Sequence, residues 1–155
     1  MQLVRTKELT TEGIDHHGLA AAVSRDLGIA DKINRRIGSK DPRRKIQPGL
    51  AVVAMIINGL GFTNRRLYLT PQFFQNKAIE FLFEEKVCAA DFDDHALGKA
   101  LDEISDYGSS KLYGELAFDV ALEQGLLGPR SHLDTTSFSL QGAYEKDGNG
   151  RRRSY

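Results

Sequence analysis

The segment that most constrains the fold is PGLAVVAMIINGLG, residues 48–61, because it is apolar almost all the way round a helix. Pro48 suits the first position of a helix, where the N–H that proline lacks would have had no partner. A helix that is apolar on most faces is usually buried on most faces. The run is also shorter than the roughly 20 residues that a membrane-spanning helix needs. The segment therefore predicts a buried helix within a helical core.

Two short helices are predicted before this segment, between residues 18 and 37, and they meet at Gly28. Glycine is a common helix stop, because it adopts the left-handed conformation at little cost. An apolar stripe recurs at helical spacing on each side of that glycine. The stripes consist of Leu19, Val23 and Leu27, and of Ile29, Ile33 and Ile37.

Further helices are predicted after the apolar segment. A short helix is expected within residues 64–74, interrupted at Pro71, and another from about 77 to 83. A helix over about 93–105 has Asp91 or Asp93 as its N-cap, and one over about 110–124 has Ser109. Their expected inner faces are Ala96, Leu97, Ala100, Leu101 and Ile104 for the first, and Leu112, Tyr113, Leu116, Val120 and Ala121 for the second.

The pattern changes near the end of the chain. From residue 131 to 144 the period is close to two, with Phe138, Leu140 and Tyr144 on one parity, which predicts a strand. A lone strand is marginally stable in water, so it either docks on the helices or belongs to a larger sheet. The sequence therefore predicts a mainly α chain, with a helical domain over residues 1–128 and the start of a β element over residues 129–155.

Asp134 lies inside this predicted strand. A carboxylate in a strand is costly unless it is solvated, paired or bound to a cation. Enzymes that cut phosphodiesters with two metal ions hold aspartates in this way to ligate Mg²⁺. The alternative is a surface aspartate on a half-exposed strand, or a turn residue.

Charge is balanced overall but unevenly distributed. Lysine and arginine total 21, as do aspartate and glutamate, so the net charge is zero. The span 84–106 is acidic, whereas basic residues cluster in three places. The clusters are Arg35, Arg36, Lys40, Arg43, Arg44 and Lys45, opposed only by Asp41; Arg65 and Arg66; and Arg151, Arg152 and Arg153.

The basic loop between the predicted helices suits contacts to DNA phosphates, although many charged loops are only solvated. A helix-turn-helix can be built from the segments on either side of Gly28, and it would carry Arg35 and Arg36 on its second helix. We therefore expect duplex DNA as a partner, with the first two basic clusters making the contacts.

The remaining polar groups suggest no second chemistry. The groups beginning at Asp15 and Asp93 place acids beside histidines, but neighbouring residues on a helix face different ways and chelate poorly. Cys88 is the single cysteine, and we expect a small buried residue rather than a nucleophile. Without a disulfide framework or a signal peptide, a cytoplasmic protein is expected.

Five segments in order resemble the amino-terminal part of the DDE transposases of bacterial insertion sequences, of the IS-four-like type. They are IDHHGLAAAVSRDLGIADKI, IQPGLAVVAMIINGLGFTNRRLYL, PQFFQNKAIEFLF, DDHALGKALDEI and HLDTTSFSLQGAY. The resemblance implies a catalytic domain of ribonuclease-H-like fold, of which this chain would hold only the first strand and the beginning of the second. Asp134 would be the first carboxylate of the catalytic triad and a ligand of Mg²⁺.

The family's second Asp and its Glu have no counterpart here, so we expect a truncated chain that is not an enzyme by itself and holds no Mg²⁺ alone. The implied role is binding of DNA at the transposon ends and assembly for transposition, in a bacterial cytoplasm and on the nucleoid. The competing interpretation is a protein-interaction module that forms homo-oligomers or binds a full-length transposase. No membrane and no small-molecule substrate are expected.

Overall fold

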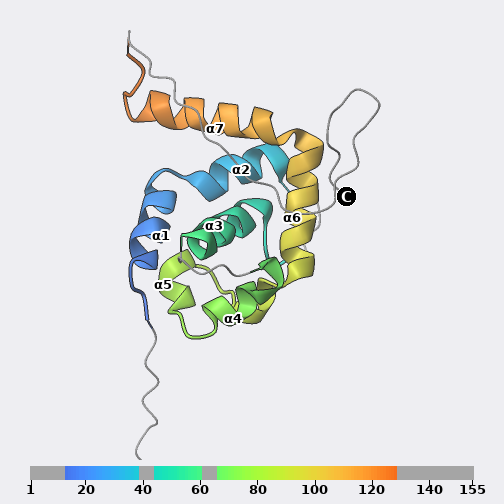
Figure 1. The fold of residues 1–155 in the computed structure, drawn as a ribbon. Coiled ribbons are helices and arrows are strands. Elements are labelled where there is room, and N and C mark those ends of the chain that lie inside the picture. The colour runs from blue at the N-terminus through green and yellow to red at the C-terminus, as the bar shows by residue number, and fades with distance from the viewer. Residues whose placement is uncertain (1–12, 39–43, 61–65, 129–155) are drawn as a thin grey trace, which may run out of the picture.

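The computed structural model describes residues 13–38, 44–60 and 66–128. Helix α3 (Pro48–Gly59) lies at the centre, and the other described helices surround it (Figure 1). Leu50, Val53 and Ile57 are buried on it, together with both of its alanines. Pro48 is its first residue, where no backbone N–H is required. The prediction of a buried central helix is therefore confirmed.

Helices α1 (His17–Asp26) and α2 (Ile29–Ile37) meet at Gly28, as predicted. Gly28 has a φ of 61°, a left-handed conformation that glycine adopts without steric cost. On α2, Ile33 is buried, so its predicted stripe points inward.

The predicted stripe of α1 is wrong. Leu19 is 71% exposed and Val23 is exposed, whereas Ala21 and Ser24 are buried. Helix α1 packs against α3 and α5 (Ile79–Phe83), and apart from His17 its buried residues have small side chains. The spacing of the leucines identified a helix, but it did not identify the face that the neighbouring helices cover.

Helices α2 and α3 approach so closely that their backbones are in contact at Gly49 and Ala30. A Cβ on Gly49 would lie 2.1 Å from the carbonyl oxygen of Ala30. The N–H of Gly49, which is free of helical bonding at the start of α3, donates to Asn34 Oδ1 at 2.7 Å. Glycine is therefore required at this crossing.

Below α3, the turn η1 (Leu67–Leu69) leads directly into α4 (Thr70–Phe74). The predicted interruption at Pro71 is wrong: α4 begins at Thr70, and Pro71 is its second residue, in the first turn, where proline is tolerated. Aromatic rings from α4, α5 and the turn η2 (Ala89–Asp91) with its following residue form one cluster, in which Phe74 contacts Phe83 and Phe92 at centroid distances of 5.3 and 5.1 Å.

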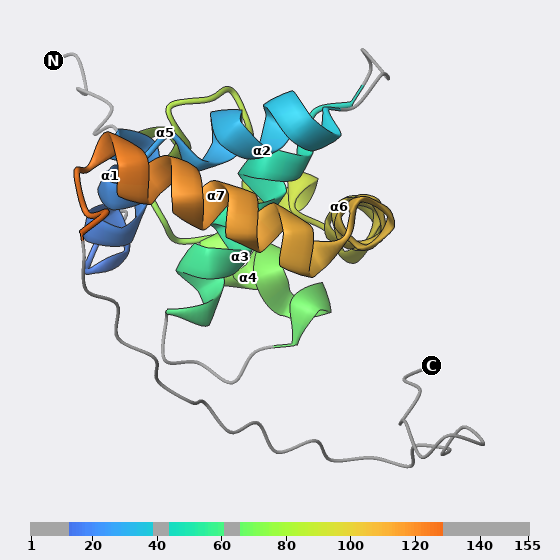
Figure 2. The same cartoon turned by 90° about the horizontal axis from the view of Figure 1, so that it is seen from above.

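Helix α6 (Asp94–Tyr107) stands beside α3, and α7 (Ser109–Glu123) lies alongside α2 (Figure 2). Asp93 caps α6, accepting from the N–H of Ala96 at 2.7 Å, as predicted. The predicted cap of α7 is wrong: Gly108 with φ 99° is the N-cap, and no side chain caps the helix. Of the predicted inner face of α7, Leu112 is buried but Tyr113 is 75% exposed.

The described residues contain no strand, only an isolated bridge between Gly13 and Lys77. The mainly α fold is confirmed for them. The predicted strand over 131–144, with Asp134, lies outside the described residues. No helix in the described ranges is long and apolar enough to cross a membrane.

Candidate nucleic-acid interface

Arg44 is one of the predicted phosphate contacts, but its guanidinium group is paired with a carboxylate of the same chain. Its Nη1 donates to both oxygens of Glu103 on α6, at 2.7 and 2.6 Å. Its Nε donates to the carbonyl of Ile46. The side chain of Arg44 is only 8% exposed. These contacts tie the segment before α3 to α6, so Arg44 has a structural role in this conformation.

Arg36 is also paired. Its Nη2 lies 2.5 Å from Asp119 Oδ2 and its Nε lies 2.9 Å from Glu115 Oε2, both on α7. The hydrogen bond to Asp119, followed by that to Glu115, raises the pKa of Arg36 above its usual value. The hydrogen bond from the Tyr107 hydroxyl, and then that from Arg36 Nε, lower the pKa of Glu115.

Lys45 remains accessible. Its Nζ lies 2.9 Å from Asp91 Oδ1, but its side chain is 70% exposed. Asp91 accepts from the N–H of Cys88 at 2.9 Å, and this bond is the main cause of the lowered pKa of Asp91. Cys88 itself is exposed, so the expectation that it is buried is wrong. It lies on the turn that holds Asp91 in place, outside the apolar core.

Basic groups border a shallow hollow at the first half of α6. The hollow has a volume of about 220 Å³. Lys45 lies on one side of it, and His95 and Lys99 of α6 on the other, with Asp91 as the acidic residue of the rim. We call Lys45, His95 and Lys99 the basic rim. His95 and Lys99 were missed from the sequence because they lie inside the acidic span.

Arg35 and Arg66 are exposed, and neither has an ion-pair partner among the described residues. Arg35 is on the last turn of α2, and Arg66 directly precedes η1, which contacts α6. Lys40, Arg43, Arg65, the arginines at 151–153 and Asp134 lie outside the described residues.

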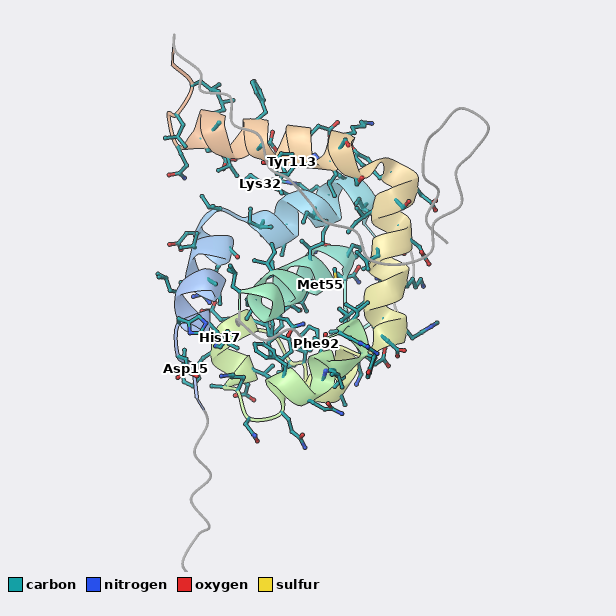
Figure 3. The ribbon with its side chains drawn as sticks, in the orientation of Figure 1. Asp15, His17, Lys32, Met55, Phe92 and Tyr113 are labelled. Carbon is teal, nitrogen blue, oxygen red and sulfur yellow. The ribbon has the colours of Figure 1, made fainter. Side chains whose placement is uncertain are left out.

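The basic and acidic spans of the sequence face each other. Arg44 and Lys45 pair with Glu103 and Asp91 of the span 84–106, over separations of 59 and 46 residues. The uneven charge distribution thus serves internal pairing in part. Lys32 was also missed: its side chain is 6% exposed, between α2 and α7, and pairs with Glu123 of α7 (Figure 3).

Within the described ranges, no group of three or more His, Cys, Asp and Glu side chains could hold a metal ion. His16 and His17 are neighbours with ring centroids 4.1 Å apart, yet His17 is buried against Phe73 at the start of α1. Burial is the main cause of its lowered pKa. His17 is therefore a core residue in this structure.

Several apolar side chains are exposed along α7. Tyr113, Phe118 and Leu122 are all more than half exposed, as are Leu126 and Leu127 beyond the helix. A Cβ added to Gly114, on the same helix, would meet no other atom within 4 Å, so the surface is open there. Exposed apolar groups gathered on one element are typical of contact surfaces.

A family described as "Domain of unknown function (DUF4277)" matches residues 9–118, which include all the helices from α1 to α6 and the first part of α7. No curated protein and no solved structure matches the chain.

Proposed function

The chain belongs to the DUF4277 family, and from this premise we propose that its helical part is the amino-terminal DNA-binding and assembly domain of a transposase. The resemblance to DDE transposases supports the reaction class, and the exposed basic groups support the DNA contact. In a complete enzyme, Asp134 would be the first carboxylate of a Mg²⁺ site for DNA strand cleavage and transfer. This chain alone is proposed to bind DNA at transposon ends without cutting it.

The proposal of DNA binding rests on the cations that the internal ion pairs leave accessible. Arg35 and Arg66 have no ion-pair partner among the described residues, and Lys45 is 70% exposed beside Lys99 and His95. Lysine and arginine contacts to phosphates supply most of the sequence-independent affinity for DNA. Lys45 borders the hollow at α6, and α6 also contacts η1, which follows Arg66, and α2, which carries Arg35. We therefore propose α6 as the helix along which the DNA backbone runs.

The same observation divides the basic residues into two groups. Arg36 and Arg44 are proposed to stabilise the fold in the described conformation, because carboxylates occupy their guanidinium groups. Lys40, Arg43 and Arg65 remain proposed contacts on sequence grounds alone. Arg44 should be left intact in a test of DNA binding, since its loss would leave Glu103 partly buried without its partner.

The test is the triple variant Arg35→Gln, Lys45→Gln, Arg66→Gln, measured by fluorescence anisotropy with a labelled mixed-sequence duplex. We expect its affinity to fall at least about tenfold at about 50 mM salt, because three phosphate contacts are lost. The matched control removes the same charge elsewhere, through Arg25→Gln, Lys86→Gln and Lys111→Gln. Equal losses in both variants would show that only net charge matters and would reject the proposed interface.

A second candidate function is a protein-interaction module for a further copy of the chain or a full-length transposase. The exposed apolar side chains of α7 favour it, in particular Phe118 and Leu122. Sedimentation of the wild-type chain beside a Phe118→Ser, Leu122→Ser variant separates the two functions. Self-association that this variant loses, with unchanged DNA affinity, would assign α7 to assembly.

A further inference from the structure

Helix α7 is held against α2 by a row of charged groups. Lys32 Nζ lies 2.6 Å from Glu123 Oε2, and Arg36 contacts Asp119 at 2.5 Å and Glu115 at 2.9 Å. On α7 the three carboxylates follow one another at intervals of one helical turn. On α2 the two cations are also one turn apart, so the rows match in spacing.

Apolar packing contributes little to this contact. Leu112 is the one buried residue of α7, while Leu116 and Val120 are partly exposed. The carboxylate side chains remain 36%, 32% and 51% exposed at Glu115, Asp119 and Glu123. Water therefore reaches these carboxylates, but it hardly reaches Lys32 and Arg36, whose side chains are 6% and 19% exposed. A competing anion can displace the carboxylates only if it pairs with both cations in their place, because a buried charge without a partner is costly.

The cations are positioned by their own helix as well as by α7. Lys32 Nζ also donates to the carbonyl of Leu27 at 2.7 Å, in the turn before α2. Arg36 Nη1 donates to the carbonyl of Lys32 at 2.9 Å. These bonds need no group from α7, so the pair of cations would keep its spacing, about 6 Å along the helix axis, if α7 moved away.

A DNA strand presents anions in a comparable row, since successive phosphates carry one charge each. Lysine and arginine pair readily with phosphate, and the guanidinium fork suits it as it suits carboxylate. Arg35 is on the same last turn of α2 and is exposed already. Lys32 and Arg36 would extend its contact along the helix.

We propose that the face of α2 bearing Lys32 and Arg36 is a second DNA-phosphate surface, and that α7 covers it with carboxylates that occupy the positions of phosphates. This inference rests on the proposed DNA-binding function and adds a regulatory element to it. Docking of α7 and full engagement of α2 by a duplex exclude each other. The carboxylates of α7 thus lower the DNA affinity of the resting chain.

If the ion pairs between α2 and α7 only stabilise the fold, a different result is expected. Neutralising the carboxylates of α7 would then loosen α7 and change DNA affinity no more than any equal change in net charge. If the carboxylates compete with phosphates for α2, the gain in DNA affinity should exceed that general effect and should depend on the cations of α2.

The test compares the full chain with the variant Glu115→Gln, Asp119→Asn, Glu123→Gln and with a control of equal charge, Asp26→Asn, Glu80→Gln, Glu84→Gln. The control residues are exposed and lie on α1, on α5 and directly after α5, outside the proposed DNA path along α6. The probe is a labelled mixed-sequence duplex. We expect the α7 variant to bind about tenfold more tightly than the control at about 50 mM salt, with a log–log salt slope steeper by about 1.8, as two added phosphate contacts require.

Adding Lys32→Gln and Arg36→Gln to the α7 variant should remove this gain. If the wild-type chain binds DNA and the α7 variant matches its control, the inference fails and the proposed function stands. If neither the wild-type chain nor the α7 variant binds at about 50 mM salt, both fail. If circular dichroism shows that the α7 variant is unfolded, the single change Glu123→Gln replaces it, because this change leaves both ion pairs of Arg36 in place. The DNA affinity of Glu123→Gln must then exceed that of the control Glu80→Gln by about threefold.

Discussion

His17 is buried at the first residue of α1, with 4% of its surface exposed. Neither ring nitrogen has a hydrogen-bond partner in the described structure. Burial, followed by repulsion from Lys77 and His16, lowers the pKa of His17 below its ordinary value of 6.5, and Asp15 and the backbone of Ile14 only partly offset this. At neutral pH the folded chain therefore favours the neutral form of His17.

This arrangement predicts acid sensitivity. Below pH 6.5 the unfolded chain takes up a proton at His17 more readily than the folded chain does. The free energy of unfolding should therefore fall as the pH is lowered from 6.5 toward the folded pKa, and the stability from a neutral His17 is present above that window. His17→Phe should remove this part of the slope, and should stabilise the chain by about 1 kcal/mol at neutral pH by removing unsatisfied nitrogens.

Urea unfolding of both chains at several pH values measures the difference. Comparing the two chains cancels the contributions of other titrating groups to the pH dependence. One of these groups is Glu85, whose pKa is raised by burial and then by Asp31, so its contribution has the opposite sign. Parallel pH profiles for wild type and His17→Phe would contradict this account of His17.

At the scale of elements, the crossing of α2 and α3 is the contact most sensitive to a single methyl group. A Cβ on Gly49 would meet three backbone atoms of Ala30, at 2.1, 2.7 and 2.7 Å. Backbone cannot rotate aside as a side chain can, so one of the two helices would have to shift. The hydrogen bond from the Gly49 N–H to Asn34 would then be lost as well.

Gly49→Ala should therefore destabilise the chain by about 3 kcal/mol, as overpacking of a core contact does. Gly98→Ala on α6 is the matched control, because a Cβ there has nothing within 4 Å. Replacing that glycine should stabilise the chain by up to about 1 kcal/mol through helix propensity. Thermal unfolding followed by circular dichroism distinguishes the two, and equal midpoints would refute the close approach of α2 and α3.

At the scale of the whole molecule, local patterns predicted the helices well. Proline at the start of α3, glycine between α1 and α2, and aspartate before α6 each act within a few residues, so they can be read from the sequence. Faces that depend on distant neighbours could not be predicted in the same way. The exposed Leu19 and Tyr113 fit helical periodicity, but their surroundings are set by other elements.

The candidate site was predictable only in part for the same reason. A cluster of cations is visible in the sequence, whereas the carboxylates that neutralise some of them come from residues far along the chain. Arg44 pairs with Glu103 across 59 residues, and Arg36 with Asp119 across 83. Periodicity gives no information about such pairs, so it could not separate the structural arginines from the accessible Arg35 and Arg66.

The central claim is that the accessible cations bind duplex DNA. The most direct measurement is the affinity of the wild-type chain for a mixed-sequence duplex between about 50 and 200 mM salt. With Arg35, Lys45 and Arg66 each contacting a phosphate, log affinity should fall with log salt with a slope of about −2.7 or steeper. Binding that is absent at about 50 mM salt, or that does not change with salt, would contradict the account.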